Sequence, residues 1–351
     1  MPRLSYLTIS GSPHEAGQAL GRFGADAVHR HLLASRDWAS VMQWRGSAQA
    51  RAMASLVRER FPCVWAELEG LAAGLGLPFD DVFLWNARGD VGAMVPEGCT
   101  TVQLPGADAR RIVHNEDGDP GFGDHCAIAE CAIGGSPRFA GFIYPGSLPG
   151  HTFAVSDGGL AMTVNNLRLL HVEPGVPRMV LTRALLDVTG LPAALALLRD
   201  APHAGGFHVT LAHRASGELA SVEFGAGFCS VHTVGAPSLH ANHAIHPEAR
   251  DRPQIITGSS EHRQLRGNRL LADAAAAAPE PLVILADRGD SKFPIHRDDP
   301  ADSDGENTLA TADITIRAER IDWKVHEHPD SAPRFLMTDG HSRSLHTPER
   351  R

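Results

Sequence analysis

The tetrapeptide Gly98-Cys99-Thr100-Thr101 lies about a quarter of the way along this chain of 351 residues. A cut between Gly98 and Cys99 would leave Cys99 as a chain terminus that carries both a thiol and a free α-amine. An α-amine titrates at about pH 8 and a thiol at about pH 8.5, so the amine could take the thiol proton directly or through a water. The alternative is that Cys99 is a buried cysteine on an ordinary strand, because residues 99–104 alternate as a strand does.

Polar side chains follow several of the apolar runs further along the chain. A hairpin that starts at Cys99 and ends near Asn115 would return Asp117 to the neighbourhood of the thiol. The strand-like run 159–166 ends on Asn165 and Asn166, and a run that begins at Leu239 ends on Asn242 and His243. Amides at strand ends are suitable donors to an oxyanion.

Together these segments resemble the acyl-coenzyme A:6-aminopenicillanic acid acyltransferase family, a branch of the N-terminal-nucleophile (Ntn) hydrolases. The resemblance covers about residues 98 to 310, with its motifs in the family's order. They are Gly98-Cys99-Thr100-Thr101, Asn115-x-Asp117, Val164-Asn165, Gly175-Val176-Pro177 with Arg183, Asn242-His243, Ser260-x-x-Arg263-x-x-Arg266, Pro294-Ile295-x-Arg297 and Thr308-Leu309.

The resemblance implies an inactive precursor that cuts itself before Cys99 and keeps both fragments in one folded unit. It implies that Cys99 is the nucleophile, that Asn242 donates to the oxyanion, and that Asp117 orients the new terminus or assists the cut. Asn165 would lie beside the substrate amide. No cofactor is implied, and the partners would be a small amide substrate, the N-terminal fragment and, as a further possibility, other copies of the chain.

The chain departs from the family pattern around Asn115. His114 stands where the related cysteine enzymes that hydrolyse bile salts and penicillin V have arginine or glutamine, and Glu116 and Gly118 stand where aromatic residues are common. Relatives often have cysteine at the position of His296. We therefore do not expect penicillin as the substrate. His114 would contact substrate, act as a switchable cation beside Cys99, or be purely structural. Glu116 would face either solvent or the pocket, where it would favour a cationic substrate.

The composition is that of an ordinary globular protein, with 43% hydrophobic and 21% charged residues. A net charge of −9, without a stripe of lysine and arginine, argues against a nucleic-acid partner. The 20 histidines are scattered, and we expect no metal site.

The five cysteines form no tight framework, which favours reduced thiols and a cytoplasmic setting. We expect no leader peptide and no membrane span, because no apolar run is long enough. Cys63, Cys126, Cys131 and Cys229 are interpreted as buried structural residues, and Arg183, Arg263 and Arg266 as structural arginines. Ser260 is as consistent with a helix N-cap as with a catalytic role.

The first 98 residues are predicted to form a strand near Leu4–Ser10 and then helices. Ser12, Pro13 and Glu15 mark the start of the first helix, and 48–60, 63–73 and a segment from Pro78 continue the helical cover. From Cys99 the pattern predicts antiparallel strands at 99–104, 110–114, 126–133, 138–143, 151–156, 159–165, 207–213, 218–224, 228–233, 308–317 and 321–326. Helices are predicted at 177–189, 192–200 and 259–278.

This order fits the α+β class and a four-layer αββα sandwich of two antiparallel sheets between helices. We expect residues 1–98 to be the fragment released by the cut, 99–337 the catalytic fragment and 338–351 a disordered tail. The favoured function is hydrolysis of a small N-acyl amide through a thioester on Cys99. Acyl transfer to an amine, or a member of the fold that is never cut and only binds, are the alternatives.

Overall fold

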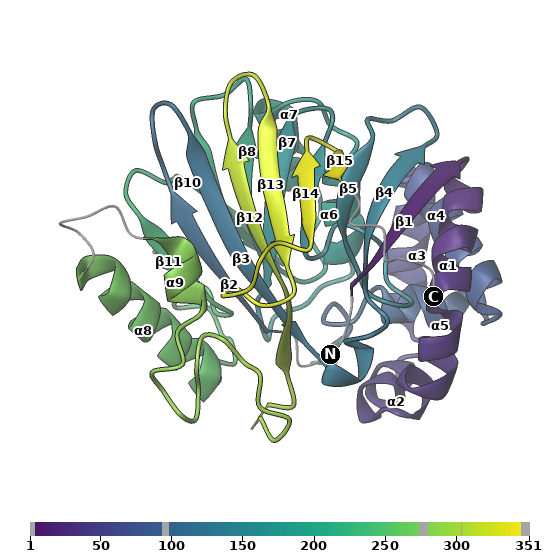
Figure 1. The fold of residues 1–351 in the computed structure, drawn as a ribbon. Coiled ribbons are helices and arrows are strands. Elements are labelled where there is room, and N and C mark those ends of the chain that lie inside the picture. The colour runs from purple at the N-terminus through teal and green to yellow at the C-terminus, as the bar shows by residue number, and fades with distance from the viewer. Residues whose placement is uncertain (1–3, 93–97, 274–279, 303, 345–351) are drawn as a thin grey trace, which may run out of the picture.

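The structure is a computed structural model that describes residues 4–92, 98–273, 280–302 and 304–344. Two sheets pack face to face between two layers of helices (Figure 1). The predicted α+β class and four-layer αββα sandwich are confirmed. Among the described helices, none combines the length and the apolar character needed to cross a membrane.

The first sheet has eight strands, and all neighbours are antiparallel except β1 and β4, which are parallel. Its order is β1 (Ser5–Gly11), β4 (Ala127–Ile133), β5 (Phe139–Ile143), β6 (Phe153–Ser156), β7 (Leu160–Asn166), β8 (Phe207–His213), β9 (Leu219–Gly225) and β10 (Phe228–Thr233).

The second sheet has seven antiparallel strands. Its order is β11 (Ser238–His240), β2 (Gly98–Leu104), β3 (Arg110–Gly118), β12 (Asn307–Ile316), β13 (Ile321–His326), β14 (Phe335–Thr338) and β15 (His341–Ser344). The strand predicted to begin at Cys99 therefore lies inside this sheet, between β11 and β3.

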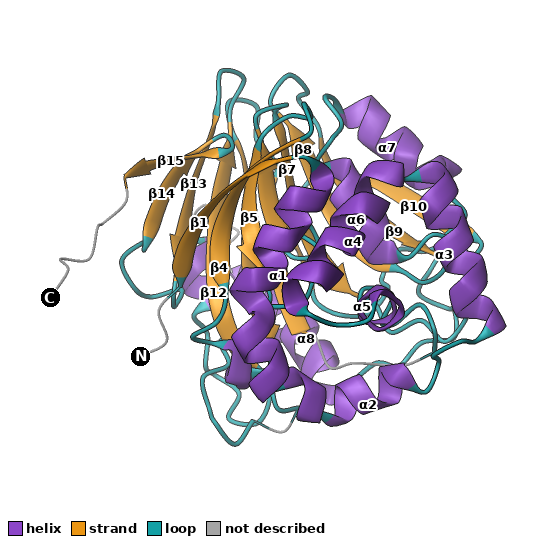
Figure 2. Cartoon of the chain, turned by 90° about the vertical axis from the view of Figure 1, so that its right-hand side faces the viewer, coloured by secondary structure: helices purple, strands orange, loops and turns teal. Residues whose placement is uncertain are grey.

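Helices cover the outer face of each sheet. Figure 2 shows α1, α4, α6 and α7 in front of the first sheet, while α8 and α9 contact β11, β2 and β3 of the second. The helices are α1 (Pro13–Arg30), α2 (Arg36–Met42), α3 (Ala48–Arg60), α4 (Pro62–Leu75), α5 (Phe79–Trp85), α6 (Arg178–Leu185), α7 (Leu191–Asp200), α8 (Gly258–Asp273) and α9 (Pro281–Leu285). Two single 3₁₀ turns lie at Leu32–Ala34 and Pro120–Phe122.

Helix α1 begins as the sequence predicts. The Ser12 side chain accepts from the Glu15 main-chain N–H, and the Glu15 carboxylate accepts from the Ser12 main-chain N–H, with Pro13 in the first turn. Farther along, Gly17 of α1 lies directly against the Glu67 carbonyl of α4, and Gly70 of α4 against the His14 carbonyl. A side chain at either glycine would force the two helices apart.

Aromatic side chains fill the space between the two sheets. The Phe153 ring of β6 meets the Trp323 ring of β13 edge-on with centroids 6.4 Å apart, and it lies 5.9 Å from the His114 ring of β3. A separate apolar cluster joins the second sheet to its helices, and includes Val102, Val113, Leu239, Leu271 and Leu285. The site described below lies among these layers.

The C-terminal segment differs from the prediction. Residues His341–Ser344 form β15, which pairs with β14, so a disordered tail from residue 338 is wrong for this part. Thr338 pairs with His341 across the two-residue turn Asp339-Gly340, in which Asp339 has φ of 48°. Asp-Gly is a strong hairpin signal that the composition of the tail obscured. Residues 345–351, and the end of the predicted helix at 274–279, lie outside the described residues.

The cysteines other than Cys99 do not share one environment. Cys126 and Cys131 are fully buried, as expected of small apolar residues. Cys63 is exposed and Cys229 is only half-buried, so the interpretation of both as buried is wrong. Cys63 lies in the first turn of α4, on the side that faces solvent.

Candidate active site

Cys99 is the second residue of β2, and the predicted hairpin with β3 is confirmed. Gly98 pairs with Asp117 and Cys99 pairs with Glu116 across the two strands. The side chain of Cys99 is 3% exposed and points into the space between the two sheets. The thiol therefore meets whichever β3 side chains share its face.

The alternation of the hairpin divides the predicted residues between two faces. His114 and Glu116 lie on the face of Cys99, whereas Asn115 and Asp117 lie on the opposite face, toward α8 and α9. The Asn115 amide donates to the Leu285 carbonyl of α9 at 2.9 Å and accepts from the Thr311 hydroxyl at 2.7 Å. The structure therefore does not bring Asn115, expected at the substrate, to the thiol.

Asp117 lies beside the residue that precedes the expected cut. Its Oδ1 accepts from the Thr308 hydroxyl at 2.7 Å, and its buried Oδ2 has no hydrogen-bond partner among the residues that the structure describes. Gly98, directly across the hairpin, has no room for a side chain because the Glu306 carboxylate and the Arg297 guanidinium lie against it. Asp117 thus lies against the Gly98–Cys99 junction.

Glu116 is buried and faces the thiol. One of its carboxyl oxygens, Oε2, lies 3.9 Å from Cys99 Sγ and 3.1 Å from His114 Nε2. The other, Oε1, accepts a hydrogen bond of 3.0 Å from the Tyr144 hydroxyl. Of the two orientations considered for Glu116, the structure has the inward one.

His114 is fully buried, and burial lowers its pKa to about 3. It is therefore a neutral imidazole at physiological pH. The interpretation of His114 as a switchable cation does not fit this environment. Its remaining ring nitrogen, Nδ1, lies 2.8 Å from the Thr101 hydroxyl.

Burial also raises the pKa of the Cys99 thiol well above its ordinary value, and the carboxyl groups of Glu116 and Asp117 add to this effect. A hydrogen bond from the Asn166 main chain to the thiol acts in the opposite direction but is outweighed. The thiol is therefore protonated in the uncut chain, and any reaction of Cys99 must begin by removing that proton.

Asn242 holds the main chain of Cys99. Its side-chain Oδ1 accepts from the Cys99 main-chain N–H at 2.9 Å and from Arg263 at 2.6 Å, while its Nδ2 donates to the Asn166 carbonyl at 3.3 Å. The atom that the cut would turn into an α-amine is thus already bound to the predicted oxyanion residue. Asn242 and Asn166 lie together next to Cys99.

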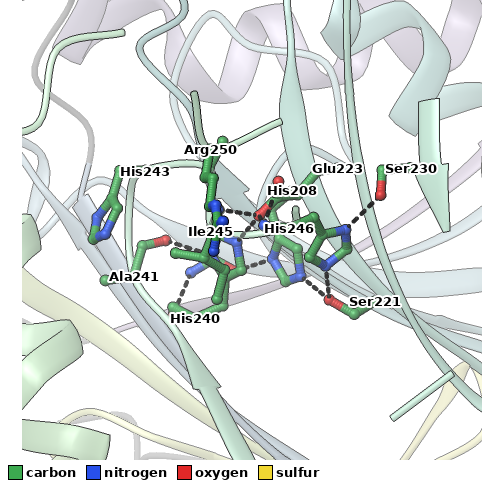
Figure 3. A network of polar contacts seen from close by, with 12 residues as sticks. His208, Ser221, Glu223, Ser230, His240, Ala241, His243, Ile245, His246 and Arg250 are labelled. Carbon is green, nitrogen blue, oxygen red and sulfur yellow. Dashed lines mark hydrogen bonds and ion pairs between the residues drawn. The ribbon is translucent and has the colours of Figure 1, made fainter. Parts of the chain in front are cut away.

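The loop that carries Asn242 is held by a buried ion pair (Figure 3). Nε2 of His240 donates to Glu223 Oε1 at 2.8 Å, and the same carboxylate accepts from the main-chain N–H groups of Ile245 and His246. These contacts fix both ends of the segment from His240 to His246. His240 and Glu223 therefore position Asn242, although neither is bonded to Cys99 in these contacts.

Arg263 is closer to the site than the sequence suggested. Its fully buried guanidinium donates to the Cys99 carbonyl at 2.5 Å and to the Thr100 hydroxyl at 2.8 Å, in addition to Asn242. The structural interpretation holds for Arg183, which pairs with Glu67 at 2.8 Å, and for Arg266, which pairs with Asp287 at 2.7 Å. Ser260 accepts from the Asn242 main-chain N–H at 2.9 Å and so supports the same loop.

The sequence model of the acyl-coenzyme A:6-aminopenicillanic acid acyl-transferase family matches residues 105–329, which are more than half of the chain. The chain belongs to this family. A curated relative, beta-alanyl-dopamine/carcinine hydrolase of Drosophila melanogaster, is 24% identical over 220 residues, which are 56% of this chain and 57% of the relative. The chain therefore matches little more than half the length of that protein.

A solved structure of penicillin V acylase from Agrobacterium tumefaciens is also similar to this acyltransferase-family chain. The identity is 13% and the TM-score 0.35, over 68% of this chain and 85% of that one. The assignment of the two-sheet sandwich rests on the strand pairing of this chain and not on that similarity.

Three further residues of this family member border the site: Tyr144, Arg297 and Glu306. The Arg297 guanidinium forms an ion pair with the Glu306 carboxylate against Gly98. Burial nevertheless raises the pKa of Glu306 to about 7, because desolvation outweighs the attraction of Arg297. Arg297 belongs to a matching motif, but nothing in the sequence marks Tyr144, which reaches the site only through folding.

Asn165 does not reach the thiol. Its Oδ1 is bound to Thr101 and to His208, and its Nδ2 to the His240 carbonyl. Its neighbour Asn166, and not Asn165, contacts Cys99 and Asn242. Asn165 instead connects the two sheets.

A small pocket of about 40 Å³ opens behind Tyr144. Aromatic rings of Trp85, Phe122 and Tyr144 line it, together with the carboxylates of Asp37 and Asp119. Arg88 also lines the pocket, but its guanidinium lies over the Trp85 ring and donates to the Trp85 carbonyl. Because Tyr144 is bound to Glu116, this pocket is separated from Cys99 by two side chains.

Proposed function

We propose that this chain is an autoprocessed cysteine amidohydrolase, which cuts its own Gly98–Cys99 bond and then cleaves a small N-acyl amide through a thioester on Cys99. The observation that supports this best is the contact between Asn242 Oδ1 and the Cys99 main-chain N–H. A cut there would free an amine that is already oriented next to its own thiol. The family membership points to the same class of chemistry on amides.

In the proposed mechanism the new α-amine takes the thiol proton, and the thiolate attacks the substrate carbonyl. The developing oxyanion would accept hydrogen bonds from Asn242 Nδ2 and from the Asn166 main-chain N–H. The protonated amine would return its proton to the leaving amine. Water would then release the acid and regenerate Cys99.

Acyl transfer to an amine remains the alternative, because it proceeds through the same thioester. Adding a primary amine during turnover distinguishes the two reactions: a hydrolase releases mainly the free acid, whereas a transferase forms the new amide in proportion to the added amine.

The substrate class that we infer from the pocket is an amide that carries a positive charge at some distance from the scissile bond, because the side chains of Glu116 and Tyr144 separate the pocket from Cys99. A cation would lie among the rings of Trp85, Phe122 and Tyr144 and near the Asp37 and Asp119 carboxylates. We assign the charge preference to Asp119 rather than to Glu116, because Asp119 lines this pocket and Glu116 does not. Asp119 also accepts from the Gly121 main-chain N–H at 2.8 Å and lies 2.6 Å from His31 Nε2, so a bound cation would share this carboxylate with His31. The name of the insect relative, beta-alanyl-dopamine/carcinine hydrolase, agrees with this class.

A matched panel of β-alanyl amides and their N-acetylated, uncharged analogues tests the substrate class. We expect higher kcat/KM for the cationic series, and a smaller preference in Asp119→Asn. Asp251→Asn, at a position whose side chain is 88% exposed, is the control. Equal kcat/KM across the panel would rule out charge selection by this pocket.

Intact-mass measurement of freshly purified protein tests the cut itself. We expect two pieces, residues 1–98 and 99–351, that co-elute under native conditions, with Cys99 as the first residue of the larger one. A chain that stays whole after long incubation would favour a member of the fold that binds without being cut.

A further inference from the structure

The hydrogen bonds between the two sheets have assignable directions, beginning at Asn165. Its Nδ2 must face the His240 main-chain carbonyl, 3.1 Å away, because a carbonyl oxygen only accepts. Its Oδ1 therefore faces the Thr101 hydroxyl at 2.7 Å and His208 Nδ1 at 3.1 Å. Both of these groups must donate to it.

The assignment agrees with the surroundings of His208 (Figure 3). With its hydrogen on Nδ1, His208 presents a bare Nε2, which accepts from the Ser221 hydroxyl at 2.9 Å. The ring is stacked on His240 with centroids 3.5 Å apart. Burial and the charge of His240 lower the pKa of His208 well below its usual value, so that His208 is neutral, as the assignment requires.

The same reasoning fixes His114. Thr101 has one hydroxyl hydrogen and gives it to Asn165, so His114 Nδ1, 2.8 Å away, must donate to Thr101. A neutral His114 then has no hydrogen on Nε2. That bare nitrogen faces Glu116 Oε2 at 3.1 Å, and two acceptors do not stay at this distance unless a proton lies between them.

We propose that Glu116 is a neutral carboxylic acid in the uncut chain, that it donates its proton to His114 Nε2, and that this pair removes the Cys99 thiol proton for self-cleavage. The proposal rests on the proposed cut at Gly98–Cys99. Before the cut, the nitrogen of Cys99 is an amide and cannot act as a base, so another acceptor is required. Glu116 Oε2, at 3.9 Å, lies within hydrogen-bonding reach of Sγ.

The proton transfers balance. The thiol proton moves to Glu116 Oε2 while the proton already there moves to His114 Nε2, which leaves a thiolate, a neutral acid and an imidazolium. Because burial disfavours this imidazolium, it exists only transiently, until the proton is passed on. The thiolate attacks the Gly98 carbonyl carbon, the bond from that carbon to the Cys99 nitrogen breaks, and the nitrogen receives the proton back through Glu116. Water then hydrolyses the Gly98 thioester and releases the thiol and the Gly98 carboxyl group.

The groups that face Glu116 are compatible with a neutral acid there. They include His114 on β3, Cys99 on β2, Tyr144 after β5 and Cys126 before β4. Burial, followed by the charge that an ionised Glu116 would carry, raises the pKa of both the Tyr144 hydroxyl and the Cys126 thiol well above their usual values. Both groups stay protonated, and Tyr144 donates to the oxygen of Glu116 that His114 does not use.

Glu116→Gln separates proton transfer from structure, because a glutamine amide can donate to His114 Nε2 and accept from Tyr144 but cannot pass a proton on. The exposed pair His171–Glu173, with the same spacing along the chain and an N···O distance of 2.8 Å, provides the matched control Glu173→Gln. We expect Glu116→Gln to have the thermal midpoint of the wild type and to cut itself at least about a hundredfold more slowly. Glu173→Gln should cut at the wild-type rate.

If the wild type cuts itself and Glu116→Gln cuts itself at the same rate, the role of Glu116 in proton transfer is overturned, while the proposed function as an autoprocessed amidohydrolase stands. If the wild type never cuts itself, the proposed function fails, and the position of the proton is decided by a second measurement. In Cys99→Ala labelled with ¹⁵N-histidine, NMR should show His114 as the neutral ring with hydrogen on Nδ1, unchanged from about pH 5 to pH 9.

An imidazolium, or a neutral ring with hydrogen on Nε2, would overturn the proposal. So would metal analysis that finds one equivalent of zinc in the uncut wild type, since the thiol, Nε2 and a carboxylate oxygen lie within 4.8 Å of one another and an ion could then replace the proton.

Discussion

Replacing Asn242 by alanine removes the side chain that holds the Cys99 main chain. The Cys99 N–H would lose its acceptor at 2.9 Å, and leaving one buried donor unpaired costs roughly 1 to 3 kcal/mol of stability. Arg263 would lose one contact but keep those to the Cys99 carbonyl and to Thr100. We therefore expect a lower thermal midpoint but a folded protein.

The effect on catalysis should exceed the effect on folding. Loss of one oxyanion donor raises the barrier by about 3 kcal/mol, which is about a hundredfold in kcat. Asn242→Asp separates the two roles of the side chain, because it keeps an oxygen for the Cys99 N–H but turns the donating Nδ2 into an acceptor. The Asn242→Asp variant should still accept a hydrogen bond from the Cys99 main-chain N–H, but its kcat should be about a hundredfold lower than that of the wild type.

The assay follows the two fragments by mass over time and then measures kcat on the fraction that has been cut, counted by alkylation of Cys99. Asn268→Ala on the exposed side of α8 is the control for an amide removed elsewhere. Wild-type kcat in Asn242→Asp would show that Nδ2 does not stabilise the transition state. Wild-type kcat in Asn242→Ala would remove this residue from the mechanism altogether.

Three further outcomes are expected. Gly98→Ala should block self-cleavage, because the added carbon would collide with the Glu306 carboxylate; fragments formed at the wild-type rate would refute this. Burial raises the pKa of Glu306 from 4.5 to about 7, so the folded state holds its proton more tightly, and stability should fall by about 3 kcal/mol as pH rises from 4.5 to 7. Thermal melts of Glu306→Gln should lack this component, and an equal pH dependence in the variant would contradict it. Cys99→Ser should cut slowly and Cys99→Ala not at all, whereas Cys131→Ala should keep hydrolysis; activity in Cys99→Ala would assign the chemistry to another residue.

The sequence predicted the elements well because their signals are local. The start of α1 depends on residues 12 to 15 alone, and the strands from Cys99 onward follow the turn residues between them. Residues 341–344 were misjudged because a segment rich in serine, histidine and arginine was interpreted by composition, although an Asp-Gly turn precedes it.

The site was predictable only in part, because its details depend on strand register and on distant segments. The proximity of Cys99 and β3 followed from the hairpin, but a shift of one residue would have placed Asn115 rather than Glu116 beside the thiol. Arg263 and Glu306 reach the junction from α8 and from the segment before β12. The residues near Cys99 in the sequence carry no pattern that indicates a contact with a residue as distant as Arg263, 164 positions further along the chain.

Strand β1 lies at the edge of the first sheet, parallel to β4, so residues on both sides of Gly98–Cys99 share one sheet. While the chain is continuous, folding is unimolecular, because the covalent chain keeps β1 within a limited distance of β4. After a cut, the same pairing would need two separate molecules to meet, and refolding would depend on their concentration. The covalent bond between Gly98 and Cys99 would thus be needed only for the first folding of the chain. Afterwards, the lifetime of the mature protein would be set by the rate at which its two fragments dissociate.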